Sequence, residues 1–177
     1  MTGVILAGGS NRRYPLLKGL IELKGKRLIE RVRDSLREFK DLAIITNRPE
    51  VYFYLGIPLY GDTVDFRCPL TGIHTALSAL GDDVFICGCD MPFIRHELVR
   101  AIKEEALIKL TTFDAIIPLR DGRPQPLLGV YSKRLSNKIK EWLNTRRCNM
   151  TEFLKEINTL YLEESFVRNF DPEGLSF

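Results

Sequence analysis

Two stretches of the sequence carry the residues that could do chemistry. The first, residues 6–20, reads LAGGSNRRYPLLKGL and combines two glycines with arginines, a proline and a lysine. Glycines let backbone N–H groups come close to a ligand, and Arg and Lys side chains supply positive charge. This combination suits a polyphosphate. A surface loop with scattered basic residues would explain the same stretch.

Neither of the two best-known phosphate-binding loops is present. The Gly-x-Gly-x-x-Gly fingerprint of dinucleotide-binding proteins is missing, and the P-loop requires Gly-Lys followed by Ser or Thr. Lys18 instead follows Leu17 and precedes Gly19. A dehydrogenase of the Rossmann type is therefore not expected, and any phosphate site here must be built differently.

The second stretch, residues 84–94, reads VFICGCDMPFI and places one carboxylate after an apolar run. Pro92 disfavours a helical conformation at Met91, so the chain has to turn away directly after Asp90. A single aspartate at a strand end suits Mg²⁺, which takes one or two carboxylates together with waters and substrate phosphates. A turn residue or a helix cap is the simpler alternative for Asp90.

Strands that alternate with helices must position these residues. The apolar patterns predict strands at 3–7, 20–23, 42–46, 57–60, 84–88, 114–118, 126–131 and 158–162. Between them, helices are expected near 27–39, after the Pro69-Leu70-Thr71-Gly72 stretch, near 95–109 and near 133–144. This alternation predicts an α/β fold with a doubly wound, mostly parallel sheet and helices on both faces, in three layers.

Several polar and glycine residues fall at the carboxyl ends of these predicted strands. They are Gly8-Gly9, Asn47, Asp62 and Asp90. Because ligands of open α/β sheets bind outside the carboxyl ends of the strands, we expect these residues to share one rim.

Length and composition limit the class of protein. The 177 residues predict a single domain, 1–177, and the formal net charge of +3 is too small to indicate nucleic-acid binding. Neither a membrane span nor a signal peptide is expected from the apolar runs. The four cysteines and two histidines do not form a zinc motif. This composition fits a cytoplasmic protein with reduced thiols.

Taken together, the motifs resemble the molybdenum cofactor guanylyltransferase family, a MobA-like branch of the nucleotidyltransferases with the nucleotide-diphospho-sugar-transferase-like fold. The resemblance runs almost from end to end of the chain. It is carried by Leu6-Ala7-Gly8-Gly9, Arg13, Lys18-Gly19-Leu20, Asp62, Pro69-Leu70-x-Gly72, Cys89-Asp90-Met91-Pro92, Pro124-Gln125-Pro126-Leu127 with Tyr131, and Pro172-Glu173.

The resemblance implies transfer of GMP from GTP to the phosphate of molybdopterin, with or without its molybdenum, and release of pyrophosphate. It assigns GTP binding to Leu6, Ala7, Gly8, Gly9, Lys18, Asp62 and Asp90. The catalytic residues that it implies are Arg13, Lys18 and Asp90, with Mg²⁺ bound by Asp90. It also implies contact with other molybdenum cofactor biosynthesis proteins or molybdoenzymes.

Three positions depart from the family pattern. Tyr14-Pro15 follows Arg13 where the family has a glycine, and proline removes an N–H donor from the loop. The family has an asparagine after its third strand, and Asn47 stands near that position but not clearly at it. The C-terminal Asn-x-Asn-Thr-Pro motif of the family is replaced by residues 168–172. Three alternatives therefore remain: a cytidylyltransferase, a nucleotidyltransferase acting on another phosphorylated acceptor, and a relative that binds nucleotide or pterin without catalysis.

Overall fold

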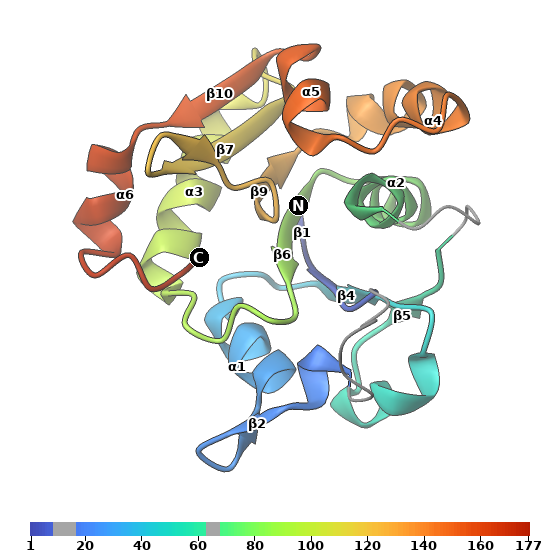
Figure 1. Ribbon diagram of the computed structural model, residues 1–177, viewed down its shortest axis with the longest axis vertical. Coiled ribbons are helices and arrows are strands. Elements are labelled where there is room, and N and C mark those ends of the chain that lie inside the picture. Colours follow the sequence, from blue (N-terminus) through green and yellow to red (C-terminus); the bar gives the residue numbers. More distant parts are fainter. Residues whose placement is uncertain (9–16, 63–67) are drawn as a thin grey trace.

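The computed structural model describes residues 1–8, 17–62 and 68–177, and a central sheet covered by helices on both faces dominates it (Figure 1). The strands are β1 (Thr2–Leu6), β2 (Glu22–Leu23), β3 (Lys26–Arg27), β4 (Leu42–Ile45), β5 (Leu59–Tyr60), β6 (Val84–Gly88), β7 (Ala115–Arg120), β8 (Arg123–Pro124), β9 (Leu128–Tyr131) and β10 (Thr159–Leu162). The α-helices are α1 (Leu28–Ser35), α2 (Pro69–Leu80), α3 (His96–Lys109), α4 (Ser136–Asn144), α5 (Met150–Lys155) and α6 (Glu164–Phe170). Short 3₁₀ turns are η1 (Lys18–Leu20), η2 (Pro49–Val51), η3 (Phe53–Leu55) and η4 (Lys133–Leu135).

The main sheet has the strand order β10-β7-β9-β6-β1-β4-β5, and β8 pairs with β7. β1 runs parallel to β4 and β6, β5 parallel to β4, and β10 parallel to β7. β9 alone in this order is antiparallel to its neighbours β6 and β7. The mostly parallel sheet expected from the sequence is thus confirmed, with β9 reversed inside it and the short β8 antiparallel to β7.

Each central strand is apolar on both of its faces, which is why the sheet supports a core on either side. In β1, Ile5 belongs to the core that α1, α3 and α6 cover, whereas its neighbour Val4 faces α2, α4 and α5. Phe85 and Ile86 of β6 divide in the same way. This near-continuous apolar character is typical of parallel strands buried on both faces. The three expected layers are therefore present.

The segment from residue 18 to residue 27 differs from the sequence prediction. A strand was expected at 20–23, but Lys18–Leu20 forms the 3₁₀ turn η1, and Glu22–Leu23 pairs only with Lys26–Arg27 in a separate hairpin. Lys24 and Gly25 have φ angles of 52° and 74°. Positive φ at both central residues is the geometry of a tight hairpin turn, which directs these strands back on each other.

Helix α1 is shorter than expected. Its α-helical part ends at Ser35, and the chain then tightens, with the Leu36 amide donating to the Arg33 carbonyl at 3.0 Å. Leu36 and Phe39 still pack in the core, as their spacing predicted. Within the described part of the chain, none of the helices combines the length and apolar character needed to cross a membrane.

The reversed strand β9 approaches β7 very closely at Gly129. A Cβ atom at this position would lie 2.7 Å from the Ile116 carbonyl oxygen and 2.7 Å from the Ile117 Cδ1 atom. A backbone carbonyl in a paired strand cannot move aside as a flexible side chain can. Glycine is therefore needed here for packing.

We expect Gly129→Ala to lower the free energy of unfolding by about 1–3 kcal/mol, because the added methyl group overpacks the sheet. Denaturant unfolding followed by circular dichroism measures this. Gly61→Ala is the matched control, since its Cβ would meet nothing closer than 3.9 Å. Equal stabilities of the two variants would show that β7 and β9 can separate at little cost.

Candidate active site

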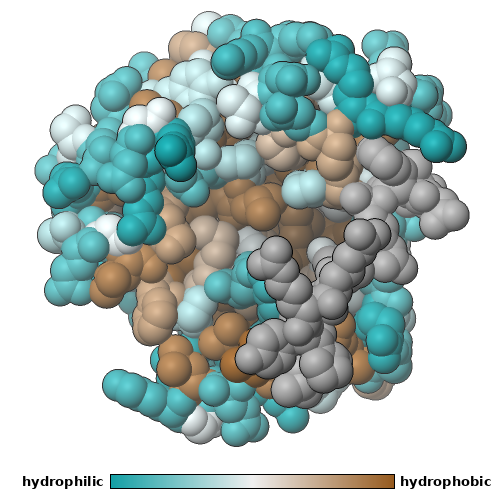
Figure 2. Space-filling view, in the orientation of Figure 1, coloured by the Kyte–Doolittle hydropathy of each residue, from teal (hydrophilic) through white to brown (hydrophobic). Residues whose placement is uncertain are grey.

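The carboxyl ends of the parallel strands bring the predicted site residues to one edge of the sheet. β1 leads to Ala7 and Gly8, β4 to Asn47, β5 to Asp62, and β6 to Asp90. The expectation of a shared rim is confirmed for these residues. Gly9 and Arg13 lie outside the described residues. Figure 2 shows that the face seen in Figure 1 is hollowed near its middle, where β1 and β6 lie, over an apolar floor.

Hydrogen bonds fix the direction in which the chain leaves β1. The Ala7 amide donates to the Ile45 carbonyl at 2.8 Å, and the Ala7 carbonyl accepts from the Thr46 hydroxyl at 3.3 Å. Thr46 is buried, and its hydroxyl also accepts from the Arg48 amide at 3.1 Å. One threonine therefore joins the end of β1 to the turn after β4. This sets the direction in which Ala7 and Gly8 leave the sheet.

Asn47 and Asp62 form a reciprocal pair beside Gly8. The Asn47 side-chain amide donates to the Asp62 carboxylate at 2.7 Å, and the Asp62 backbone amide donates to the Asn47 side-chain oxygen at 3.0 Å. A Cβ at Gly8 would lie 3.8 Å from Asp62 Oδ2, so the two residues face each other. The pair presents amide and carboxylate groups to one flank of the rim, which suits the hydroxyl and amino groups of a nucleoside.

Lys18 and Asp90 lie on the other flank and form an ion pair. The Lys18 Nζ atom is 2.7 Å from Asp90 Oδ2, although 72 residues separate the two in the chain. The hydrogen bond and the charge of Asp90 raise the pKa of the Lys18 ammonium above its ordinary value. Both side chains are substantially exposed, at 55% and 38%, so the pair contributes little to stability. The pair matters because it holds an ammonium group and a carboxylate together at the carboxyl end of β6.

The donor set at Asp90 limits the kind of metal that could bind. Across residues 1–8, 17–62 and 68–177, no three His, Cys, Asp or Glu side chains meet in a way that could hold a metal ion. The single carboxylate of Asp90 on this flank of the rim does not suit zinc, which needs three or four protein ligands. It fits Mg²⁺, which keeps several waters and takes further oxygens from substrate phosphates.

Cys89 stands next to Asp90, but its thiol is poorly suited to act as a nucleophile. Burial, together with a smaller contribution from the adjacent Asp90 carboxylate, raises the pKa of its thiol to about 12. The thiol is consequently neutral at physiological pH, and a neutral thiol is a weak nucleophile. Its backbone amide instead donates to the Leu6 carbonyl at 3.1 Å, which extends the pairing of β1 with β6 by one residue.

Helix α2 begins at the Pro-Leu-x-Gly stretch, as expected, and packs against the end of β1. Pro69 occupies the first turn, where its missing N–H costs nothing. A Cβ at Gly72 would lie 3.1 Å from a Leu6 methyl group, so the glycine lets the helix come close to the strand end. The Leu6 side chain thus packs against α2, and its expected part in nucleotide binding would come through the backbone around it.

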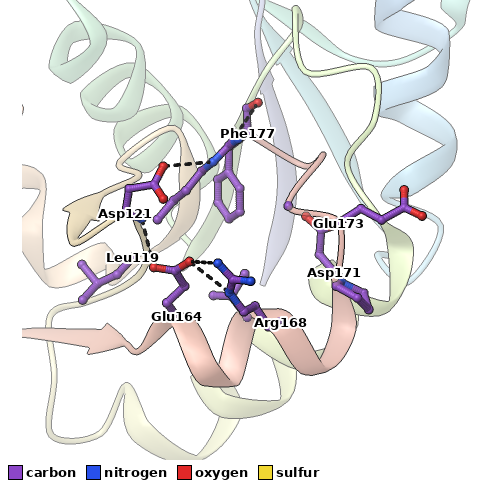
Figure 3. A pocket seen from close by; sticks show the side chains of 11 residues that line it. Leu119, Asp121, Glu164, Arg168, Asp171, Glu173 and Phe177 are labelled. Carbon is purple, nitrogen blue, oxygen red and sulfur yellow. Dashed lines mark hydrogen bonds and ion pairs between the residues drawn. The ribbon is translucent and has the colours of Figure 1, made fainter.

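A separate pocket lies farther along the same edge, between the β7–β8 hairpin, α6 and the C-terminal tail (Figure 3). Glu164 joins two of these parts, since it accepts from the Asp121 amide at 3.2 Å and from Arg168 at 2.6 Å. Arg120 donates to the Phe177 carbonyl at 3.2 Å. Arg168 is the first residue of the segment that replaces the C-terminal motif of the family, and it lines this pocket.

Sequence reasoning did not identify the contacts that hold these groups in place. The pairing of Lys18 with Asp90 joins two exposed charges, and exposed charges have no pattern that names their partners. Tyr52, which packs beneath η1, also went unnoticed. The glycine directly after Lys18 was an available signal, because a glycine beside a functional lysine often marks a close approach.

Comparisons with known proteins agree with this architecture. The family described as the MobA-like NTP transferase domain matches residues 3–159. A protein of Natranaerobius thermophilus named "Probable molybdenum cofactor guanylyltransferase" is 34% identical over 183 residues, covering 100% of this chain and 88% of the relative. The molybdenum cofactor guanylyltransferase of Desulfosudis oleivorans is 31% identical over 180 residues, with the same two coverages.

A solved structure extends the similarity to three dimensions. It is the molybdopterin-guanine dinucleotide biosynthesis protein A of Archaeoglobus fulgidus, which superposes with a TM-score of 0.85 at 26% identity. The match covers 100% of this chain and 90% of that one. Sequence and fold therefore agree, and the chain belongs to the MobA-like NTP transferase domain family of nucleotidyltransferases.

Proposed function

We propose that this protein transfers the GMP group of GTP to the phosphate of molybdopterin, with or without bound molybdenum, and releases pyrophosphate. The named relatives support the guanylyl and molybdopterin parts of this proposal. The observation that carries it is the Lys18–Asp90 pair, 2.7 Å apart, on the same rim as Gly8 and Asp62. This arrangement places a cation and a carboxylate where a nucleoside triphosphate would lie.

The two flanks of the rim would divide the nucleotide between them. The nucleoside would lie against the backbone of Leu6 to Gly9, with Asp62 held by Asn47 as its hydrogen-bonding partner. The phosphates would lie toward Lys18 and Asp90. An ammonium group has three donors, so Lys18 can contact a phosphate while it keeps one hydrogen bond to Asp90.

The reaction itself needs little covalent help from the protein. A phosphate oxygen of the acceptor attacks the α-phosphorus of GTP, the new P–O bond forms, and the bond to the departing pyrophosphate breaks with its electron pair. Mg²⁺, held by Asp90, would supply positive charge beside the reacting phosphates. Lys18 and Arg13 would orient the triphosphate and offset the charge that grows on the pyrophosphate.

The acceptor would approach from the part of the edge on the side of β6 where β9 and β7 lie. There, the pocket between the β7–β8 hairpin and α6 offers Arg120 and Arg168 on its lining. We propose that molybdopterin and the biosynthetic proteins or molybdoenzymes that exchange it reach the rim from this side. A cytoplasmic location fits a substrate such as GTP.

Nucleotide selectivity is the first test. In calorimetric titrations with Mg²⁺ present, we expect GTP to bind about tenfold or more tightly than CTP, ATP or UTP, because base-specific hydrogen bonds are lost with the other bases. Preference for CTP would move the protein to a cytidylyl activity on the same fold. Binding of none of the four would contradict the proposal.

The role of Asp90 predicts a loss of turnover without a loss of folding. We expect Asp90→Asn to lower kcat by about 100-fold or more with Mg²⁺, since the charge that holds the metal is removed. Pyrophosphate release measures the rate. Asp41→Asn, at the opposite end of β4, is the matched control because Asp41 is also exposed. Unchanged turnover in Asp90→Asn would refute the metal assignment.

The chemistry also predicts that Cys89 takes no covalent part. Very little of the protein would carry the Cys89 thiolate at pH 8, because the pKa of the thiol is raised to about 12. We expect iodoacetamide to label Cys89 far more slowly than it does in the unfolded chain, as mass spectrometry of peptides would show. Turnover of Cys89→Ala should stay within about threefold of the wild-type rate. A hundredfold loss would point to a thiol-bound intermediate.

A further inference from the structure

We infer that Tyr52 is a positioning residue for Lys18: its buried phenol and Gly19 form a seat that fixes the 3₁₀ turn η1, and with it the lysine, against Asp90. The inference rests on the proposed function, because that function gives the place of Lys18 its purpose. It adds a residue from the β4–β5 connection to the triphosphate flank of the site.

The contact between Gly19 and Tyr52 is close. Gly19 is buried, and a Cβ placed on it would lie 2.9 Å from the Tyr52 hydroxyl oxygen and 3.3 Å from the Tyr52 Cε1 atom. The same Cβ would also lie 3.4 Å from Cys89 Cβ, which is an ordinary contact. The turn thus packs against both the phenol and the residue that follows β6. The hydroxyl is the atom that leaves no room for a side chain at residue 19.

Turn η1 needs such a seat because it is short. It has three residues, and the β2–β3 hairpin that follows it pairs with itself instead of joining the main sheet. The Ile21 carbonyl accepts from the Leu28 amide at 2.9 Å, which ties the end of the turn to α1. At the Lys18 end, the close packing on Tyr52 sets the distance to Asp90.

Tyr52 is itself firmly held. Its side chain is 1% exposed, its amide donates to the Pro49 carbonyl at 3.0 Å, and its carbonyl accepts from the Leu55 amide at 3.0 Å. Burial raises the pKa of the phenol, with a contribution from Cys89, so the ring stays uncharged. Tyr52 lies on the connection from β4 to β5, the same segment that carries Asn47 at one end and leads to Asp62 at the other. One connection therefore supports both flanks of the site.

A double-mutant cycle tests the seat. Gly19→Ala forces its new methyl group against the Tyr52 hydroxyl, and we expect the affinity for GTP to fall about 10- to 100-fold as Lys18 is displaced. Tyr52→Phe alone should have a smaller effect than Gly19→Ala. The double variant Gly19→Ala/Tyr52→Phe removes the oxygen that blocks the methyl group, so its affinity should recover at least fivefold relative to Gly19→Ala. Such non-additivity is the mark of residues in contact.

A second readout needs no nucleotide. Labelling of the Lys18 amine by acetic anhydride, followed by mass spectrometry of the nucleotide-free protein, reports whether Lys18 still pairs with Asp90. We expect the labelling rate to rise severalfold in Gly19→Ala and to return toward wild type in the double variant. If wild-type protein binds no nucleotide, the proposed function fails, while this labelling still decides whether the seat positions Lys18.

Gly3→Ala is the matched control for general destabilisation. Its Cβ would lie 2.8 Å from a Leu42 methyl group at the opposite end of β1, so it overpacks the core far from Lys18. Tyr52→Phe should not rescue it, and Lys18 labelling should not change. If Gly19→Ala fails to fold, Tyr52→Leu removes the seat from the other side and should raise Lys18 labelling. Absence of rescue in the double variant, or unchanged labelling in folded Tyr52→Leu, would overturn the inference.

Discussion

The pairing of β1 with β6 is the constraint on which the rest of the site depends. Leu6 lies opposite Gly88, and one residue farther on the Cys89 amide donates to the Leu6 carbonyl at 3.1 Å. This last hydrogen bond decides where both strands end. Ala7-Gly8 and Asp90 leave the sheet from the same level, and a shift of the register by one residue would turn every side chain of the strand to the other face.

Much of this arrangement could be predicted from the sequence because buried parallel strands are easy to recognise. The apolar runs before Gly8 and Asp90 identified β1 and β6, and the rule for strand ends then placed Asn47 and Asp62 beside them. Residue pattern does not give the direction of a strand, however. The stretch at 126–131 reads like its neighbours, and only its pairing with β6 and β7 shows that β9 runs the opposite way.

The contacts that refine the site were out of reach for a different reason. Lys18 and Asp90 are 72 residues apart, and their pairing depends on the path of the 3₁₀ turn η1, of which only Leu20 falls in the strand expected at 20–23. The packing of Tyr52 on Gly19 likewise depends on how the β4–β5 connection folds over the core. Local periodicity carries no information about such meetings between distant segments. They follow from the assembled fold.

The reversed direction of β9 affects how the sequence of such an enzyme can diverge. Because β9 runs backwards, the segment that precedes it, and not the one that follows it, arrives at the edge of the sheet used by the site. That segment is anchored locally: the Gln125 amide donates to the Pro118 carbonyl at 2.9 Å, and the Tyr131 hydroxyl donates to the Pro126 carbonyl at 2.8 Å. β9 therefore divides this edge of the sheet into two separate parts. The length and sequence of the hairpin beyond it can diverge toward a new acceptor while the strand ends that carry Asp62 and Asp90 keep their register.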